Sequence, residues 1–169
     1  QCIDWGLDWY AVNDVLPVSS NVRALLINPL TPATLYAGIY DFVFISMDGG
    51  DEWGFYVIDS PVHALAIDPV TPTTIYAGTD AGVFRRTASE NWTAVNEGLE
   101  NTTVRALAID PVTSSTLYAG TWGGVFISTN GGESWTAASS GLSDPIIFSL
   151  AIDPLTPSTL YAGTSAGVH

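Results

Sequence analysis

The chain repeats one pattern of apolar and polar positions four times. Each copy holds four short runs rich in Val, Ile, Leu, Tyr, Phe, Thr and Trp, and Gly, Pro, Asn, Asp and Ser separate them. Such runs predict β-strands, and the separating residues predict turns. In the third copy the runs are 104–110, 116–121, 124–128 and 135–139. No stretch has helical periodicity, so we expect an all-β protein.

The first run of each copy is apolar on both sides. In the third copy, alternation places Val104 and Ala106 on one face and Leu107 and Ile109 on the other. A strand that is apolar on both faces is covered on both faces. This run is therefore predicted to be an inner strand between neighbouring sheets.

The spacing of the copies predicts a specific architecture. They start at Val22, Val62, Val104 and Ile147, so the period is 40, 42 and then 43 residues. A period of this length that holds four strands is typical of a β-propeller with four-stranded antiparallel blades. We expect a single propeller, or a segment of one, over 1–169. The predicted blades are approximately 22–61, 62–103, 104–146, and 147–169 together with 1–21.

The fourth copy stops within its third run, and the first residues of the chain supply the missing remainder. We therefore expect residues 1–21 to complete the last blade. Four blades would make a tight ring with a narrow axis. Two alternatives stay open: the chain is part of a longer one, or two copies associate to complete a larger ring.

A second motif lies between the third and fourth runs. SMDGGDEW at 46–53 follows the pattern SxDxGxxW, and STNGGESW at 128–135 repeats it with Asn in place of Asp. CIDWGLDW at 2–9 starts with Cys, and FRRTASENW at 84–92 keeps only the Trp. The motif resembles the Asp-box, or BNR repeat, of sialidase-type β-propellers. The matching residues are Cys2, Asp4, Gly6, Trp9, Ser46, Asp48, Gly50, Trp53, Trp92, Ser128, Asn130, Gly132 and Trp135.

The residue types of this motif suit a turn rather than catalysis. An Asp or Asn oxygen accepts hydrogen bonds from nearby backbone amides, and Gly permits positive φ. The Trp offers a large apolar face that packs back onto the sheet. The resemblance implies that these boxes lie away from the ligand-binding face. We expect a structural role, and Asn130 keeps the acceptor oxygen that this role needs.

The sequence predicts neither a metal site nor a cofactor. Asn28, Asp68, Asp110 and Asp153 each precede a Pro, which is typical of a turn. The closely spaced oxygen ligands of a calcium loop of the DxDxDG kind do not occur. The single cysteine, Cys2, supplies no metal cluster and no internal disulfide.

Composition limits the classes of partner. There are 17 acidic residues against four Arg and no Lys, which gives a formal net charge of −13. This charge repels phosphate backbones, so we expect no nucleic acid. No apolar run approaches the roughly 18 residues of a membrane span, so we expect no insertion. The chain starts at Gln rather than Met and has no basic segment followed by an apolar one, so we expect a processed product or an excerpt of a longer chain. We also expect an exported protein, extracellular or periplasmic. The glycosylation acceptor patterns at Asn91 and Asn101 are as expected from chance in a chain rich in Asn and Thr.

Binding is expected on the segments that are not repeated. In a propeller, the loops between second and third strands share one face with the loops that join neighbouring blades. The second position of the first run lies near this face and is not the same in all copies. The ligand-binding candidates are Arg23, His63, Arg105 and Phe148 at that position, with Tyr40 and Trp122 on the loops.

These features favour a non-catalytic repeat module that presents a loop face to a protein or carbohydrate partner. The alternative is a glycoside hydrolase, sialidase-like or xyloglucanase-like, or a fragment of one. The resemblance implies three clustered Arg for a sialidase, and the sequence lacks that family's arginine motif. An inverting glucanase needs two carboxylates about 6–10 Å apart. Asp41 and Asp80, on neighbouring loops, are the only candidate pair for this catalytic role.

Overall fold

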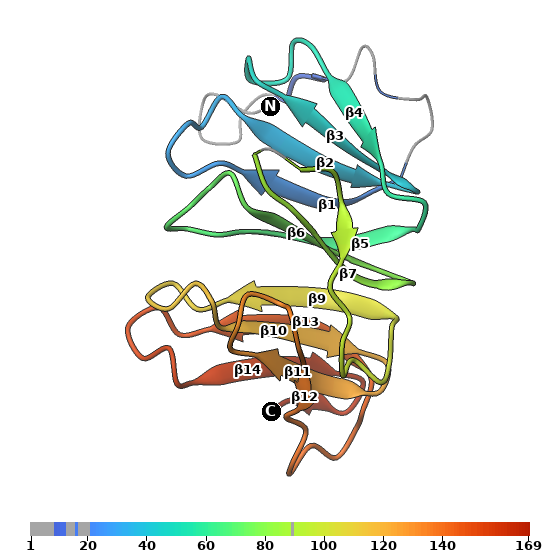
Figure 1. Cartoon of the computed structure of the whole chain (residues 1–169), viewed down its shortest axis with the longest axis vertical. Helices are drawn as coiled ribbons and strands as arrows, with labels where there is room; N and C mark the ends of the chain where they lie inside the picture. The colour runs from blue at the N-terminus through green and yellow to red at the C-terminus, as the bar shows by residue number, and fades with distance from the viewer. Residues whose placement is uncertain (1–8, 13–15, 17–20, 89) are drawn as a thin grey trace.

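The protein folds into antiparallel sheets (Figure 1), as shown by a computed structural model that describes residues 9–12, 16, 21–88 and 90–169. The described residues form strands and turns, and no α-helix occurs among them. They therefore contain no helix that is long and apolar enough to cross a membrane. The all-β prediction is confirmed. The strands of the first two sheets are β1 (Val22–Ile27), β2 (Leu35–Ile39), β3 (Phe42–Ser46), β4 (Gly54–Val57), β5 (Val62–Ile67), β6 (Ile75–Thr79), β7 (Gly82–Arg86) and β8 (Thr93–Ala94).

Each sheet is built from strands in sequence order, so each is a simple meander. The inner strands β1, β5, β9 and β13 lie beside one another and join the four sheets into one stack (Figure 1). These sheets correspond to the blades predicted from the repeats. The remaining strands are β9 (Val104–Ile109), β10 (Leu117–Thr121), β11 (Gly124–Ser128), β12 (Thr136–Ala137), β13 (Ile147–Ile152), β14 (Leu160–Thr164) and β15 (Gly167–Val168).

The fourth sheet has three strands among the described residues, β13, β14 and β15. Its completion by residues 1–21 falls largely outside the described part of the chain, as do Cys2, Asp4 and Gly6 of the first predicted box. The described residues 9–12 lie with the first sheet, because the Val12 carbonyl accepts a hydrogen bond from Trp53 Nε1 at 3.0 Å. The first and fourth sheets lie at opposite ends of the molecule's long axis (Figure 1). Residues 9–12 therefore do not pair with β15.

A glycine in the second strand of each sheet sets the distance to the next sheet. A Cβ atom on this glycine would lie 2.6 or 2.7 Å from a methyl group at the start of the next inner strand. Carbon atoms pack best about 3.5–4.0 Å apart, so any larger residue would push the sheets apart. The three pairs are Gly38 with Val62, Gly78 with Val104, and Gly120 with Ile147.

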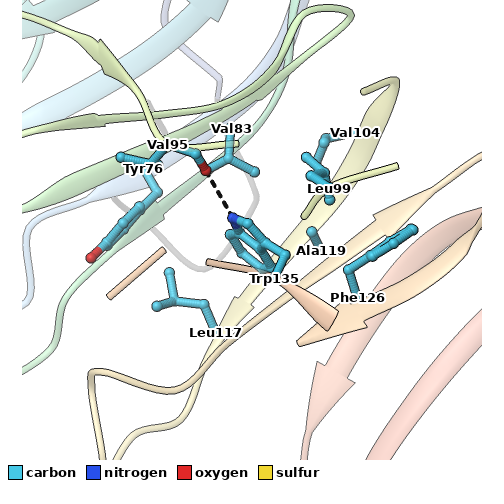
Figure 2. Packing of buried hydrophobic residues seen from close by; sticks show 9 residues of the cluster. All are labelled: Tyr76, Val83, Val95, Leu99, Val104, Leu117, Ala119, Phe126 and Trp135. Atoms are coloured by element: carbon cyan, nitrogen blue, oxygen red, sulfur yellow. Dashed lines mark hydrogen bonds between the residues drawn. The ribbon is translucent and has the colours of Figure 1, made fainter. Parts of the chain in front are cut away.

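The same side chains fill each junction. Between the second and third sheets, Tyr76, Val83 and Trp135 belong to one buried cluster (Figure 2). Leu107 and Ile109 pack against this cluster. Between the first and second sheets the corresponding residues are Tyr36, Val43, Leu65 and Ile67. One face of a sheet thus supplies Tyr and Val, and the opposite face of the next sheet supplies Leu and Ile.

The two outermost faces of the stack carry the same residues without a neighbouring sheet. Tyr161 is 50% exposed, whereas its counterpart Tyr76 is 3% exposed. At the other end, Leu25 is 66% exposed, whereas its counterpart Leu65 packs into a junction. Association of two copies through such faces stays a prediction.

Replacement of Gly78 by Ala is expected to destabilise the fold by about 1–3 kcal/mol, because the new Cβ would overlap the stiff side chain of Val104. Chemical unfolding measures this loss. Gly163→Ala is the matched control, because the nearest atom there is the hydroxyl of Ser149, which can rotate away. Equal losses in the two variants would show that the glycine does not set the junction.

Candidate functional site

Each inner strand carries a β-bulge at its second residue. In β1, Val22 lies opposite Ile39 and Ala24 lies opposite Gly38, so Arg23 has no residue opposite it. A bulge redirects the side chain of the extra residue and is common beside binding sites. The other residues at this position are His63 in β5, Arg105 in β9 and Phe148 in β13.

Two of these bulge residues, Arg23 and Arg105, lie beside the ring of a third, His63. Arg23 Nη1 lies 3.1 Å from His63 Nδ1, and Arg105 Nη1 lies 3.5 Å from the same atom. On the other side of the ring, Nε2 lies 2.8 Å from Asp80 Oδ1. The histidine is buried, and the Asp80 side chain is 46% exposed. We call Arg23, His63, Asp80, Arg105 and Trp122 the axial cluster.

The two arginines fix the proton on His63. A guanidinium group can only donate hydrogen bonds, so Nδ1 must accept from Arg23. The ring proton then lies on Nε2 and is donated to the Asp80 carboxylate. This arrangement holds the ring in one orientation and one tautomer.

Trp122 joins the cluster from the two-residue turn between β10 and β11. The Arg105 guanidinium lies 4.9 Å from the centre of the Trp122 ring, which is the geometry of a cation–π contact. The turn itself is held by Thr121, whose hydroxyl accepts a hydrogen bond from the Gly123 amide at 2.9 Å and donates one to the Gly124 carbonyl at 2.9 Å. Half of the Trp122 surface is nevertheless exposed to solvent.

The four inner strands line a shallow hollow of about 300 Å³ beside the cluster. Arg23, His63 and Phe148 all border it, and more than half of the Phe148 surface is exposed. The sequence placed these residues at matched positions, and the structure brings them to one place. It does so because the inner strands lie side by side.

Tyr40 and Asp41 form the corresponding turn of the first sheet, and they lie apart from this network. Tyr40 has positive φ, and its carbonyl accepts a hydrogen bond from the Val62 amide at 2.8 Å. Among the described residues, the Asp41 carboxylate takes part in no hydrogen bond or ion pair, whereas Asp80 is bound to His63. The two candidate catalytic carboxylates therefore lie in different environments, because Asp80 is bound to His63 and Asp41 is not.

Hydrogen bonds within the turn hold the predicted box at 46–53. The Ser46 hydroxyl donates to Asp48 Oδ1 at 2.7 Å and accepts from the Gly50 amide at 2.8 Å. The Glu52 amide donates to Asp48 Oδ1 at 3.0 Å. The bond from the Glu52 amide, and after it the bond from the Ser46 hydroxyl, lower the pKa of the Asp48 carboxyl below its ordinary value of 3.8.

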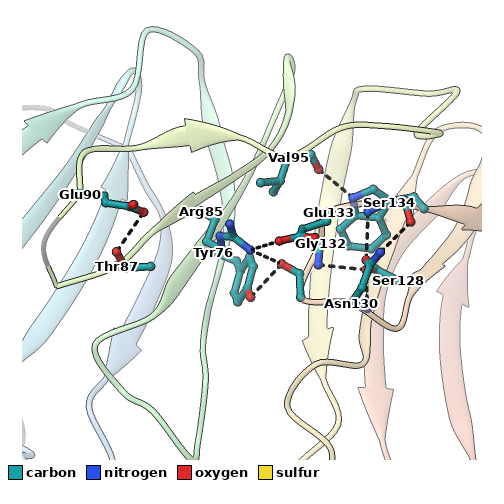
Figure 3. Close-up of polar contacts among 12 residues, drawn as sticks. Tyr76, Arg85, Thr87, Glu90, Val95, Ser128, Asn130, Gly132, Glu133 and Ser134 are labelled. Carbon is teal, nitrogen blue, oxygen red and sulfur yellow. Dashed lines mark hydrogen bonds and ion pairs between the residues drawn. The ribbon is translucent and has the colours of Figure 1, made fainter.

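Asn130 makes the same bonds in the third sheet (Figure 3). Its Oδ1 accepts from the Ser128 hydroxyl at 2.8 Å and from the Ser134 amide at 3.0 Å. Trp135 Nε1 donates to the Val95 carbonyl of the preceding sheet at 2.8 Å. The turn therefore also connects one sheet to the next, and an amide oxygen can accept the corresponding bonds.

The degenerate copy at 84–92 lacks these bonds. Trp92 Nε1 is buried and has no hydrogen-bond partner among the residues that the structure describes. Arg86, which precedes this turn, instead stacks on Tyr56 of the first sheet at 4.1 Å from the ring centre. Arg85 bridges to the third sheet through the Gly131 carbonyl at 3.0 Å (Figure 3). The sequence analysis did not predict that these two arginines connect neighbouring sheets.

The site offers polar and aromatic groups rather than ligands for a metal. Asn28, Asp68, Asp110 and Asp153 each accept hydrogen bonds from backbone amides of their own turns, as their sequence context predicts. No group of three His, Cys, Asp or Glu residues within the described ranges could hold a metal ion.

Replacement of Asp48 by Asn is expected to lower stability modestly at pH 7, because Asn130 shows that an amide can fill this position. A carboxyl with a depressed pKa stabilises the fold above its unfolded pKa, and this contribution is lost as pH falls through the folded pKa. The difference between wild type and Asp48→Asn should therefore be constant near neutral pH and shrink progressively as the pH falls below about 4. Thermal unfolding from pH 3 to 7 measures it. A difference that does not change with pH would contradict the assignment.

His63 is expected to be the tautomer that carries its proton on Nε2 and leaves Nδ1 as an acceptor. Long-range proton–nitrogen NMR correlations distinguish the two nitrogens. Replacement of Asp80 by Asn removes the anionic acceptor but keeps a carbonyl oxygen in its place. The tautomer should persist in that variant, since the arginines still require an acceptor. A proton on Nδ1 would refute this arrangement.

No family model and no curated protein matches this sequence. Solved structures do match. An ancestral GH74 enzyme is 23% identical over 90% of this chain, with a TM-score of 0.72, and the match covers 22% of that enzyme. A GH74 enzyme of Niastella koreensis is 21% identical over 96% of this chain, with a TM-score of 0.76, and the match covers 31% of that enzyme.

These matches concern the fold. GH74 enzymes are β-propellers, and the likeness extends over nearly the whole of this chain. This chain spans about a quarter to a third of their length. With its four sheets joined through their inner strands, the chain has the β-propeller fold predicted from its repeats.

Proposed function

We propose that this protein is a non-catalytic propeller module that binds carbohydrate at the axial cluster. The observation that carries the proposal is the pairing of rigid hydrogen-bond donors with exposed aromatic rings. Arg105 lies against the half-exposed ring of Trp122. The exposed Phe148 borders the hollow that Arg23 and His63 also line. Binding sites for small ligands combine apolar walls with a few fixed polar groups in this way.

The side chains of the site are held before a ligand arrives. The bulges, the two-residue turn and the bonds around His63 restrict Arg23 and Arg105. Groups that are already ordered lose less conformational entropy on binding. A protein partner would use the same groups, but the hollow of about 300 Å³ suits a single sugar unit better than an extended protein surface.

A glycoside hydrolase, or a portion of one, is the second candidate. The likeness to GH74 enzymes favours it. Against it, Asp80 is already engaged by His63. Asp41 lies on another turn without a hydrogen bond to that cluster in the described structure. A pair of catalytic carboxylates would need matched access to one glycosidic bond.

The partner classes follow from the charge of the chain. A formal net charge of −13 opposes the binding of nucleic acid. Since polysaccharides are chiefly extracellular, a location outside the cell or in the periplasm is part of this proposal.

Replacement of Trp122 by Ala should weaken binding to a polysaccharide by about tenfold, which corresponds to about 1.4 kcal/mol of lost contact. A panel of xyloglucan, cellulose oligomers and pectin fragments, tested by affinity electrophoresis and calorimetry, identifies the ligand. Tyr161→Ala is the control, because this tyrosine is equally exposed but lies on β14 outside the axial cluster.

The same panel separates the two candidates. A binding module releases no reducing sugar from any polysaccharide. Cleavage that is abolished by Asp80→Asn or Asp41→Asn would replace the binding proposal with the hydrolase. Equal effects of the Trp122 and Tyr161 variants would exclude the axial cluster as the site.

A further inference from the structure

We infer that the axial cluster is a receptor for a carboxylate group, so that its ligand is an acidic sugar such as a uronate. The sugar part of this inference rests on the proposed function. The carboxylate part rests on the arginines alone and can be tested separately.

The arginines of the cluster have more donors than the protein satisfies. Each guanidinium group has five N–H donors. Arg23 and Arg105 both point one nitrogen toward the same acceptor, His63 Nδ1, which has a single lone pair. The contact from Arg105, at 3.5 Å, is the longer one. Most of the donors therefore lack an acceptor from the described protein and remain available.

Among the described residues, no carboxylate forms an ion pair with these arginines. Within the part of the chain that the structure describes, the ion pairs are His63 with Asp80 and Arg85 with Glu133. Asp80 is bound to the Nε2 side of the histidine, whereas the arginines lie on the Nδ1 side. The imidazole ring thus separates the one acid of the cluster from its two cations. A positive site results on the side of Arg23 and Arg105.

Arg105 carries an additional unsatisfied donor. Its Nε is shielded from solvent and has no hydrogen-bond partner in the described part of the chain. A buried donor without a partner costs about 1–3 kcal/mol. A carboxylate that meets the edge of the guanidinium group accepts two parallel hydrogen bonds. A small rotation of Arg105 toward such a ligand would satisfy this nitrogen.

The acidic character of the whole protein does not cancel this local charge. Charges on the surface are screened over about 8 Å at physiological ionic strength. A bound anion therefore interacts mainly with the two guanidinium groups. The distant acids that give the net charge of −13 lower the association rate of the anion more than they lower its binding affinity.

The surroundings of the arginines favour a carboxylate on a sugar ring. Trp122 stacks on Arg105, and Phe148 borders the hollow on the neighbouring strand. Both rings expose apolar surface next to the cationic site. A pyranose ring has an apolar face, and a uronate joins that face to a carboxylate at a fixed distance. A peptide carboxylate on a flexible side chain would lose more conformational entropy on binding.

The test is calorimetric titration of the whole chain with trigalacturonate, with its carboxyl-reduced form and with hexaglutamate. The carboxyl-reduced form differs only by the replacement of each carboxylate by a neutral hydroxymethyl group. We expect trigalacturonate to bind at least tenfold more tightly than either of the other two. The affinity should fall as salt is raised.

Variants locate the site. Arg23→Gln and Arg105→Gln should each weaken trigalacturonate binding at least tenfold and abolish the preference over the carboxyl-reduced form. Arg86→Gln removes the same charge at Tyr56, far along the sheet from the inner strands, and should leave binding unchanged. If Arg105→Gln fails to fold, Arg105→Lys replaces it. Lys keeps the charge but not the bidentate geometry, so its affinity should lie between those of the wild type and Arg23→Gln.

Each other outcome overturns a defined part of the inference. Equal binding of both trisaccharides leaves the carbohydrate function intact and refutes the carboxylate site. Arginine-dependent binding of hexaglutamate without trigalacturonate refutes the sugar, and with it the proposed function, but not the carboxylate site. Binding of trigalacturonate that is insensitive to Arg23 and Arg105 places the ligand elsewhere. Binding of none of the three refutes the carboxylate site.

Discussion

The close approach of a glycine to a β-branched residue governs how the sheets stack. Gly78 allows the backbone of β6 to reach Val104 of the next inner strand, and its counterparts repeat this contact at the other junctions. Larger residues would separate the sheets, and the apolar cluster around Tyr76 and Trp135 would no longer close. The tryptophan also spans the junction through its bond to the Val95 carbonyl.

The axial cluster depends on the same contact. Because the inner strands lie so close together, residues some forty positions apart in the chain come within hydrogen-bond distance of one histidine. The bulge that follows each junction residue then directs the next side chain toward the axis. Adjacent residues thus have different roles: Val62 is fully buried in the junction, and His63 forms the centre of the axial cluster.

The sequence predicted the fold more fully than the site. Repeated strands and turns report local geometry, so the four sheets, the inner strands and the hydrogen bonding of Asn130 could all be anticipated. The variable second position of the inner strands identified Arg23, His63 and Arg105 as a set. Their convergence on one nitrogen, and the capture of Asp80, depend on the bulges and on the distance between sheets. A single sequence does not encode those features in any local pattern.

Each sheet carries both halves of a junction, with Tyr and Val on one face and Leu and Ile on the other. Such a contact is head-to-tail, so it fits any unit against any other and does not limit how many can be joined. A tandem duplication in the gene would create a complete new junction at once, without a compensating substitution. The second position of each inner strand lies outside the junction contacts, so similar units can hold an arginine, a histidine or a phenylalanine there.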